Sequence, residues 1–301
     1  MNRFTLQSGN RSNTMILFPN AKINIGLDIL RRRPDGYHDL STVMAPTGWT
    51  DILEIVPSKD EIDRLSVTGR KIACPPESNI VMKAVKALRT EFNFPAVDIH
   101  LHKIIPDGAG LGGGSADAAF TIRGINQLFS LGLTDEQMAA TAASLGADCA
   151  FFIYNRPMMC EGIGNVLSST ALPIPDNLQL AIIKPEISVS TAQAYSKVIP
   201  GVPATPLNEI IENTPFELWQ GRVKNDFETS VFLQFPEIEF IKTTLLDLGA
   251  IYASMSGSGS SVYGFFDTPD ALPELQTAFP TSTIFYAPFN PQQTLCDGAS
   301  H

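Results

Sequence analysis

The segment Pro106-Asp107-Gly108-Ala109-Gly110-Leu111-Gly112-Gly113-Gly114-Ser115-Ala116 places five glycines within seven residues, 108–114. A strand-like alternation of apolar residues precedes it over 97–105, and a run of small and apolar residues typical of a helix follows it over 116–129. Glycines allow successive backbone amides to turn toward one point, and the start of a helix adds partial positive charge. The segment therefore predicts a phosphate-binding loop that needs no lysine.

The composition limits the classes of protein to which this chain can belong. It has 301 residues, of which 44% are hydrophobic, and a formal net charge of −10. Such a chain forms one large domain or two modest ones, and its charge argues against a nucleic-acid partner. No apolar run approaches eighteen residues, which argues against a membrane span. Four cysteines without a CxxC pair argue against a disulfide scaffold or structural zinc, and they predict a reducing compartment, the cytoplasm.

Strands and helices alternate along the rest of the chain. Strands are expected at 15–30, 41–47, 51–56, 66–67, 97–105, 178–183 and around 255–259, and helices at 78–92, 116–129, 134–146, 208–219 and 237–248. The polar residues 1–14 predict a disordered extension, and 31–36 a basic turn. Proline is frequent between 172 and 215, so we expect one lobe over 15–165 and a second over 166–301.

Two other nucleotide loops compete with this interpretation. A P-loop requires a lysine followed by serine or threonine after the last glycine, and this chain has none. Gly108, Gly110 and Gly113 satisfy the dinucleotide pattern GxGxxG. That pattern, however, needs a parallel strand after the helix, and here a second helix is expected to follow. A nicotinamide enzyme therefore remains a weak alternative.

Three motifs together resemble those of the kinases named after galactokinase, homoserine kinase, mevalonate kinase and phosphomevalonate kinase (GHMP kinases). They are the glycine segment, Ala21-Lys22-Ile23-Asn24 near the start, and Ser256-Gly257-Ser258-Gly259-Ser260-Ser261-Val262 near the end. The resemblance implies a two-lobe α+β fold with the active site in the cleft between the lobes. It also implies that ATP binds at 106–116.

Further segments are similar to one branch of that family, the 4-diphosphocytidyl-2-C-methylerythritol kinases. They lie at 21–27, 33–40, 109–115, 146–152 and 161–164. The most specific is Asp35-Gly36-Tyr37-His38, which other branches lack. This resemblance implies transfer of the γ-phosphate of ATP, with Mg²⁺, to the 2-hydroxyl of the cytidyl substrate in mevalonate-independent isoprenoid synthesis. Another kinase of the family, or a non-catalytic nucleotide-binding member, remains the alternative.

The resemblance implies that Lys22 and Asp148 are the catalytic pair. Asp148 is expected at the end of a helix and among apolar residues, where a carboxylate needs a partner to stay charged. As the acceptor of the alcohol proton it would be paired with Lys22. Taken singly, Asp148 could instead be a structural hydrogen-bonding acid, and Lys22 a surface lysine.

Five residues are expected to contact the substrate, and the resemblance implies that Tyr37 and His38 hold its cytidine end while Asn24 binds the same end as Lys22. Tyr37 offers a flat ring and His38 offers donors and acceptors to the cytosine edge. Asn24 lies on the same strand face as the catalytic lysine. In the second lobe, the segment 185–195 resembles the part of the family that forms the other side of the substrate site. The resemblance implies that Thr191 and Tyr195 of this segment contact the substrate.

Several weaker features are assigned no catalytic role. Ala116 stands where the family usually has a second serine, and no protein ligand for a metal is predicted. His100 and His102 share a strand face without a third ligand, which favours a solvated surface. One arginine of 31–33 could meet a substrate phosphate, although a solvated turn is the simpler interpretation.

Overall fold

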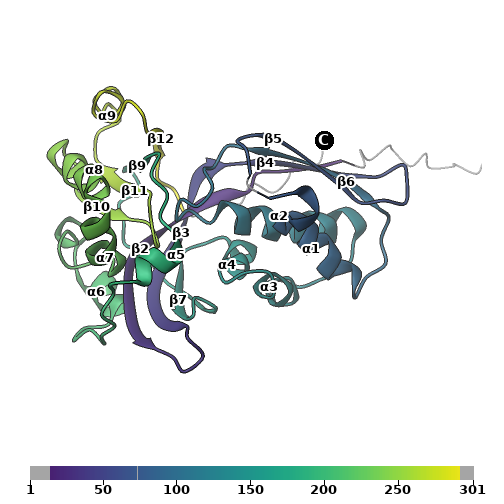
Figure 1. Ribbon diagram of the computed structural model, residues 1–301, viewed down its shortest axis with the longest axis horizontal. Helices are drawn as coiled ribbons and strands as arrows, with labels where there is room; N and C mark the ends of the chain where they lie inside the picture. Colours follow the sequence, from purple (N-terminus) through teal and green to yellow (C-terminus); the bar gives the residue numbers. More distant parts are fainter. Residues whose placement is uncertain (1–13, 73, 292–301) are drawn as a thin grey trace, which may run out of the picture.

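The computed structural model describes residues 14–72 and 74–291, so the predicted extension at 1–14 lies outside them apart from Thr14. One end of the molecule is a four-stranded sheet covered on one side by helices (Figure 1). The strand order is β1 (Met15–Leu17), β4 (Ile52–Pro57), β6 (Val97–Lys103) and β5 (Arg64–Gly69). Inward residues alternate with half-buried ones along β6, as the sequence predicts. The helices are α1 (Ile80–Arg89), α2 (Gly113–Phe129), α3 (Asp135–Ala143) and α4 (Cys149–Tyr154).

The other end of the molecule carries a second sheet and the C-terminal helices (Figure 1). Its strand order is β10 (Tyr252–Met255), β11 (Val262–Phe266), β9 (Gln179–Lys184) and β12 (Thr283–Pro288). The helices of this half are α5 (Thr191–Tyr195), α6 (Leu207–Asn213), α7 (Phe227–Gln234), α8 (Pro236–Asp247) and α9 (Leu272–Ala278).

A third sheet joins the two ends. It contains the long strands β2 (Asn20–Arg32) and β3 (His38–Thr50) with β7 (Met158–Gly162) and β8 (Val166–Ser169). Ala21, Ile23 and Ile25 of β2 are buried in one cluster with residues of the C-terminal sheet, including Tyr263 and Phe265. This middle core is therefore built from both halves of the chain.

Most predicted elements are present, with local differences that have physical causes. The basic turn is shorter than expected, because Arg31 and Arg32 continue β2 opposite Asp39 and His38. The helix expected from Ala116 already begins at Gly113, and the capping box predicted at Thr134 is formed. The division between lobes at 165 and 166 stays a proposal. Since β8 pairs with β7, we favour a point slightly later, between β8 and β9.

No helix in the described part of the chain is long and apolar enough to cross a membrane.

Candidate active site

The glycine loop connects β6 to α2 and is tightly packed. Gly110 has φ +74°, and a Cβ atom there would lie 2.1 Å from the carbonyl oxygen of Ser256. Gly112 has φ +71°, and a Cβ atom there would lie 2.9 Å from the ring of Phe152. Both positions combine a left-handed backbone with a close neighbour, so only glycine fits them.

The C-terminal glycine motif lies against this loop. The Ser256 hydroxyl donates a hydrogen bond to the carbonyl of Gly110 at 2.8 Å, and the Ser261 N–H donates to the carbonyl of Ala109 at 3.2 Å. The side-chain amide of Asn225 donates to the carbonyl of Gly257 at 2.8 Å. The two glycine segments, far apart in the sequence, thus form one surface.

Lys22 and Asn24 on β2 meet this surface. The Lys22 backbone N–H donates to the carbonyl of Leu111 at 2.9 Å, so the strand holds the loop directly. Lys22 Nζ donates to Asn24 Oδ1 and lies 3.4 Å from Asp148 Oδ2. Asn24 Nδ2 donates to Thr42 Oγ1 at 3.1 Å. Lys22 is only 3% exposed, and its ammonium therefore stands between a neutral amide and a carboxylate.

The expected setting of Asp148 is wrong in two respects. Helix α3 ends at Ala143, and Asp148 instead directly precedes α4, without making a side-chain hydrogen bond to the helix end. The apolar residues that follow it are buried, but the Asp148 side chain is 30% exposed. The apolar neighbours point into the core because they belong to a new helix, and that leaves the carboxylate at the surface of the pocket.

A pocket of about 180 Å³ joins these groups to residues of both ends of the molecule. It is lined at one end by Lys22, Gly110, Gly112, Asp148, Gly257 and Ser258, and elsewhere by residues including Asn24, Thr42, Thr191, Tyr195 and Phe227. The structure thus brings the predicted catalytic pair, the loop glycines, Asn24, Thr191 and Tyr195 to one cavity. Thr42 and Phe227 were not predicted. Thr42 lies opposite Leu27 on the neighbouring strand, so the pairing of β3 with β2 places it beside the strand that carries Lys22 and Asn24. That pairing was the signal that could have predicted Thr42 as a pocket residue.

An adjoining cavity of about 280 Å³ contains the remaining predicted substrate residues. It is lined by Gly36, Tyr37, His38, Ile163, Thr191, Ala192 and Tyr195. The ring of His38 stacks on that of Tyr195, with centroids 4.4 Å apart and planes 17° apart. The Tyr195 ring also contacts the ring of Phe227 edge-on, with centroids 4.7 Å apart. Burial raises the pKa of Tyr195. Tyr37 is 62% exposed at the rim.

The turn between β2 and β3 is held by surface ion pairs. Arg33 contacts Asp35 at 2.9 Å and Asp39 at 3.1 Å, and Arg31 also pairs with Asp39. The Tyr37 N–H donates to Asp35 Oδ1 at 3.1 Å. The arginines hold the pKa values of Asp35 and Asp39 below the ordinary carboxylate range. Arg31 and Arg33 thus support the turn that presents Tyr37.

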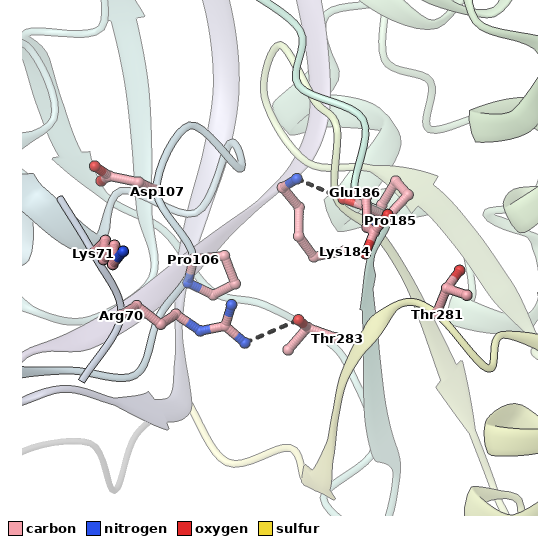
Figure 2. A pocket seen from close by; sticks show the side chains of 9 residues that line it. All are labelled: Arg70, Lys71, Pro106, Asp107, Lys184, Pro185, Glu186, Thr281 and Thr283. Carbon is pink, nitrogen blue, oxygen red and sulfur yellow. Dashed lines mark hydrogen bonds between the residues drawn. The ribbon is translucent and has the colours of Figure 1, made fainter. Parts of the chain in front are cut away.

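A crevice of about 460 Å³ lies beside the start of the glycine loop, between the two ends of the molecule (Figure 2). Arg70 crosses it and donates to Thr283 Oγ1 on β12 at 2.9 Å. Across the crevice Lys184 donates to the carbonyls of Pro185 and Ile187 at 2.6 and 2.9 Å. Next to Pro106, Arg70 thus binds a side chain of the C-terminal sheet, and Lys184 binds the backbone that follows β9.

The histidine pair on β6 is used locally. Thr68 Oγ1 lies 2.8 Å from His100 Nε2 and 2.9 Å from His102 Nδ1. Within 14–72 and 74–291, no group of three or more histidine, cysteine or acidic side chains could hold a metal ion.

Comparison with known proteins identifies the family. The model described as "GHMP kinases N terminal domain" matches residues 79–156, and that described as "GHMP kinases C terminal" matches 211–283. A 4-diphosphocytidyl-2-C-methyl-D-erythritol kinase from Bacteroides fragilis is 50% identical over 263 residues, which cover 87% of this chain and 95% of that protein. This chain is a GHMP kinase.

Other GHMP kinases agree with this assignment. A kinase of the same name from Cytophaga hutchinsonii is 42% identical over 254 residues, covering 84% of this chain and 93% of that protein. The crystal structure of a 4-(cytidine 5'-diphospho)-2C-methyl-D-erythritol kinase is similar with a TM-score of 0.74 and 30% identity, covering 90% of this chain and 98% of the other. The predicted family, α+β fold and kinase activity are confirmed.

Proposed function

We propose that this chain phosphorylates the 2-hydroxyl of 4-diphosphocytidyl-2-C-methyl-D-erythritol with ATP, in mevalonate-independent isoprenoid synthesis. The observation that carries the proposal is the pairing of Lys22 with Asp148 where the glycine loop meets the aromatic cavity. The two relatives above, at 50% and 42% identity, are named for this substrate. The cavity with His38 and Tyr195 favours a substrate with a flat ring over homoserine or mevalonate, which have none.

ATP is expected to place its phosphates on the loop over 106–116. The left-handed backbone of Gly108, Gly110 and Gly112 and the first turn of α2 supply a curved backbone of the kind that binds phosphate oxygens. Ala116, the departure from the family pattern, lies in the first turn of α2 and is completely buried in the core. Its methyl group therefore packs inward, and the loss of a hydroxyl there leaves the open face of the loop unchanged.

The reaction needs an acceptor for the alcohol proton and a cation near the transferring oxygens. Asp148 Oδ lies at the pocket surface and can accept a hydrogen bond from the substrate hydroxyl. As the new O–P bond forms, the hydroxyl proton passes to Asp148 and the bond from the γ-phosphorus to the bridging oxygen of ADP breaks. Lys22, 3.4 Å from Asp148, holds the carboxylate in place and offers positive charge to the phosphoryl group.

Magnesium, when bound with ATP, would neutralise charge on the phosphates. A magnesium ion keeps several waters and needs few protein ligands when phosphates supply the rest. The pocket fits this requirement, because its lining includes one carboxylate, Asp148, that could contact the ion or its waters.

The cytidine end is expected to receive the pyrimidine beside the stacked rings of His38 and Tyr195. Tyr37 lies at the rim of the same cavity and offers a second flat face. Asn24 and Thr191 line the pocket between this end and the catalytic pair. We place the protein in the cytoplasm, and the free thiols of Cys149 and Cys160 support a reducing compartment. Cys296 lies outside the described residues.

The test is ADP release coupled to a dehydrogenase assay, with ATP, magnesium and the cytidyl substrate. Asp148→Asn should lower kcat by at least about a hundredfold, because it removes the proton acceptor. Asp176→Asn changes an exposed acid that lines neither cavity of the site, so it is the matched control and should retain full activity. Turnover of mevalonate or homoserine but not of the cytidyl substrate would contradict the proposed substrate. Equal activity of Asp148→Asn and the control would contradict the role of Asp148.

A further inference from the structure

Three ionisable side chains are buried next to the two ends of the glycine loop. Lys103 is the last residue of β6, Asp117 lies in the first part of α2, and Asp51 lies between β3 and β4. Lys103 Nζ donates to Asp117 Oδ2 at 2.8 Å and also to Asp51 Oδ2. Their side chains are at most 3% exposed. The cluster therefore connects the strand that enters the loop with the helix that leaves it.

The cluster also fixes the backbone at the entrance of the loop. Asp51 Oδ1 accepts hydrogen bonds from the N–H groups of Ile104 and Ile105 at 2.5 and 2.8 Å, immediately before Pro106. At the far end of the loop, a Cβ atom on Gly113 would lie 3.3 Å from Lys103 Nζ. The ammonium group thus lies against the first residue of α2, and each end of the loop touches the cluster.

Apolar packing alone would be a simpler way to join these elements. Taking ions out of water is costly, and well-packed apolar residues often replace a buried ion pair without loss of stability. The cluster contacts the loop on both sides, so its hydrogen bonds can set the distance between the loop ends. We propose that Asp51, Lys103 and Asp117 are positioning residues that hold the glycine loop in the shape that binds the phosphates of ATP. This inference rests on the proposed use of ATP.

The charge balance of the cluster points the same way. One ammonium and two carboxylates would leave a net negative charge beneath a loop that binds anions. Asp117 Oδ1 is buried and has no hydrogen-bond partner among the described residues, and burial raises the pKa of Asp117 to about 8. Burial alone would lower the pKa of Lys103, but the two aspartates outweigh it and raise that pKa. Burial therefore disfavours the ionised form of Asp117, which limits the negative charge beneath the loop.

The first experiment separates the hydrogen bond of Asp117 from its charge. Asp117→Leu keeps the branched shape but removes the bond to Lys103, whereas Asp117→Asn keeps an oxygen that can accept it. Binding of ATP with magnesium is measured by titration calorimetry at pH 7. Asp117→Leu should raise Kd about tenfold, and Asp117→Asn less than about threefold, because a hydrogen bond to a charged group is lost only in the first.

Asp63→Asn is the matched control. Asp63 pairs with Arg89 at 2.6 Å and accepts from the Val97 N–H in the same end of the molecule, and neither partner belongs to the loop. It should lower the melting temperature without changing the Kd for ATP. If Asp117→Leu binds ATP like the native chain, or if Asp63→Asn weakens binding equally, the positioning role is wrong.

A pH series covers the case in which Asp117→Leu does not fold. Ionisation of Asp117 above about pH 8 adds a negative charge beneath the loop, so the Kd for ATP in the native chain should rise about threefold or more between pH 7 and 9. Asp117→Asn should show no such rise. The titratable groups that act on Asp117 are Lys103 and Asp51.

An identical alkaline rise in Asp117→Asn and the native chain would overturn the inference. Failure of the proposed function would look different. The native chain would then bind ATP without turning over the cytidyl substrate, or would not bind ATP at all.

Discussion

The two ends of the active site are built in different ways. At the phosphate end, Lys22 and Asn24 are buried, and hydrogen bonds that include backbone groups join them and the two glycine segments. At the cytidine end, Tyr37 is largely exposed and its turn is held by surface ion pairs. The first end depends on packing within a few tenths of an ångström, whereas the second depends on ring surfaces that can adjust. Substitutions should therefore have large effects at the first end and graded effects at the second.

Among the substitutions that test this difference, the largest effect is expected from Gly110→Ala. The new Cβ would lie 2.1 Å from the Ser256 carbonyl oxygen, so the two glycine segments must separate. We expect kcat/KM for ATP to fall about a hundredfold, since a displacement near 1 Å can cost that much. Gly108→Ala is the control, because Gly108 also has positive φ but nothing lies within 4 Å of its Cβ position. If both variants lose activity equally, backbone strain rather than the contact with Ser256 explains the loss.

A smaller effect is expected from Tyr195→Ala at the cytidine end. It removes the ring that stacks on His38, and we expect KM for the cytidyl substrate to rise about tenfold with a smaller change in kcat. Tyr195→Phe keeps the ring and should raise KM less than about twofold. Steady-state kinetics at saturating ATP measure both. A loss in kcat without a change in KM would place Tyr195 at the phosphate end of the site.

The smallest effect is expected from Asp39→Asn, which removes exposed ion pairs to Arg31 and Arg33. Such pairs contribute little, so KM for the substrate should change less than about twofold. The pKa values of Asp35 and Asp39 are lowered, so both carboxylates stay ionised at any pH above those values. Their ion pairs are lost only as pH falls through the lowered pKa values. These two carboxylates should therefore contribute no change in substrate KM from pH 6 to 9. A slope in that range would mean that another titrating group controls the cytidine end.

Features that depend on neighbouring residues in the sequence could be predicted. The glycine loop, the capping box at Thr134 and the alternation along β6 each follow from a short pattern. The environment of Asp148 could not be predicted, because the apolar residues after it form a short helix whose direction depends on tertiary packing. Similarly, Arg31 and Arg32 look like part of a turn, but pairing with β3 extends the strand through them.

Apart from the pairing of Lys22 with Asp148, which the family resemblance implied, contacts between distant segments escaped prediction. The stack of His38 on Tyr195 joins residues of different halves of the chain, and no sequence pattern links the two positions. The hydrogen bond from Ser256 to Gly110 of the glycine loop depends on the folding of the C-terminal sheet against β2. Asp51, Lys103 and Asp117 are ordinary charged residues in sequence, and only the fold shows that they share one buried site.

The middle core has a consequence for dividing the gene. Residues 15–170 and 171–291 each hold part of the cluster in which Ala21 and Ile23 pack near Tyr263 and Phe265. Expressed separately, each fragment would expose that apolar surface to water, and each would lack one wall of the pocket. The two fragments should therefore be poorly soluble alone and recover activity only when produced together, which suits this protein to use as a split reporter.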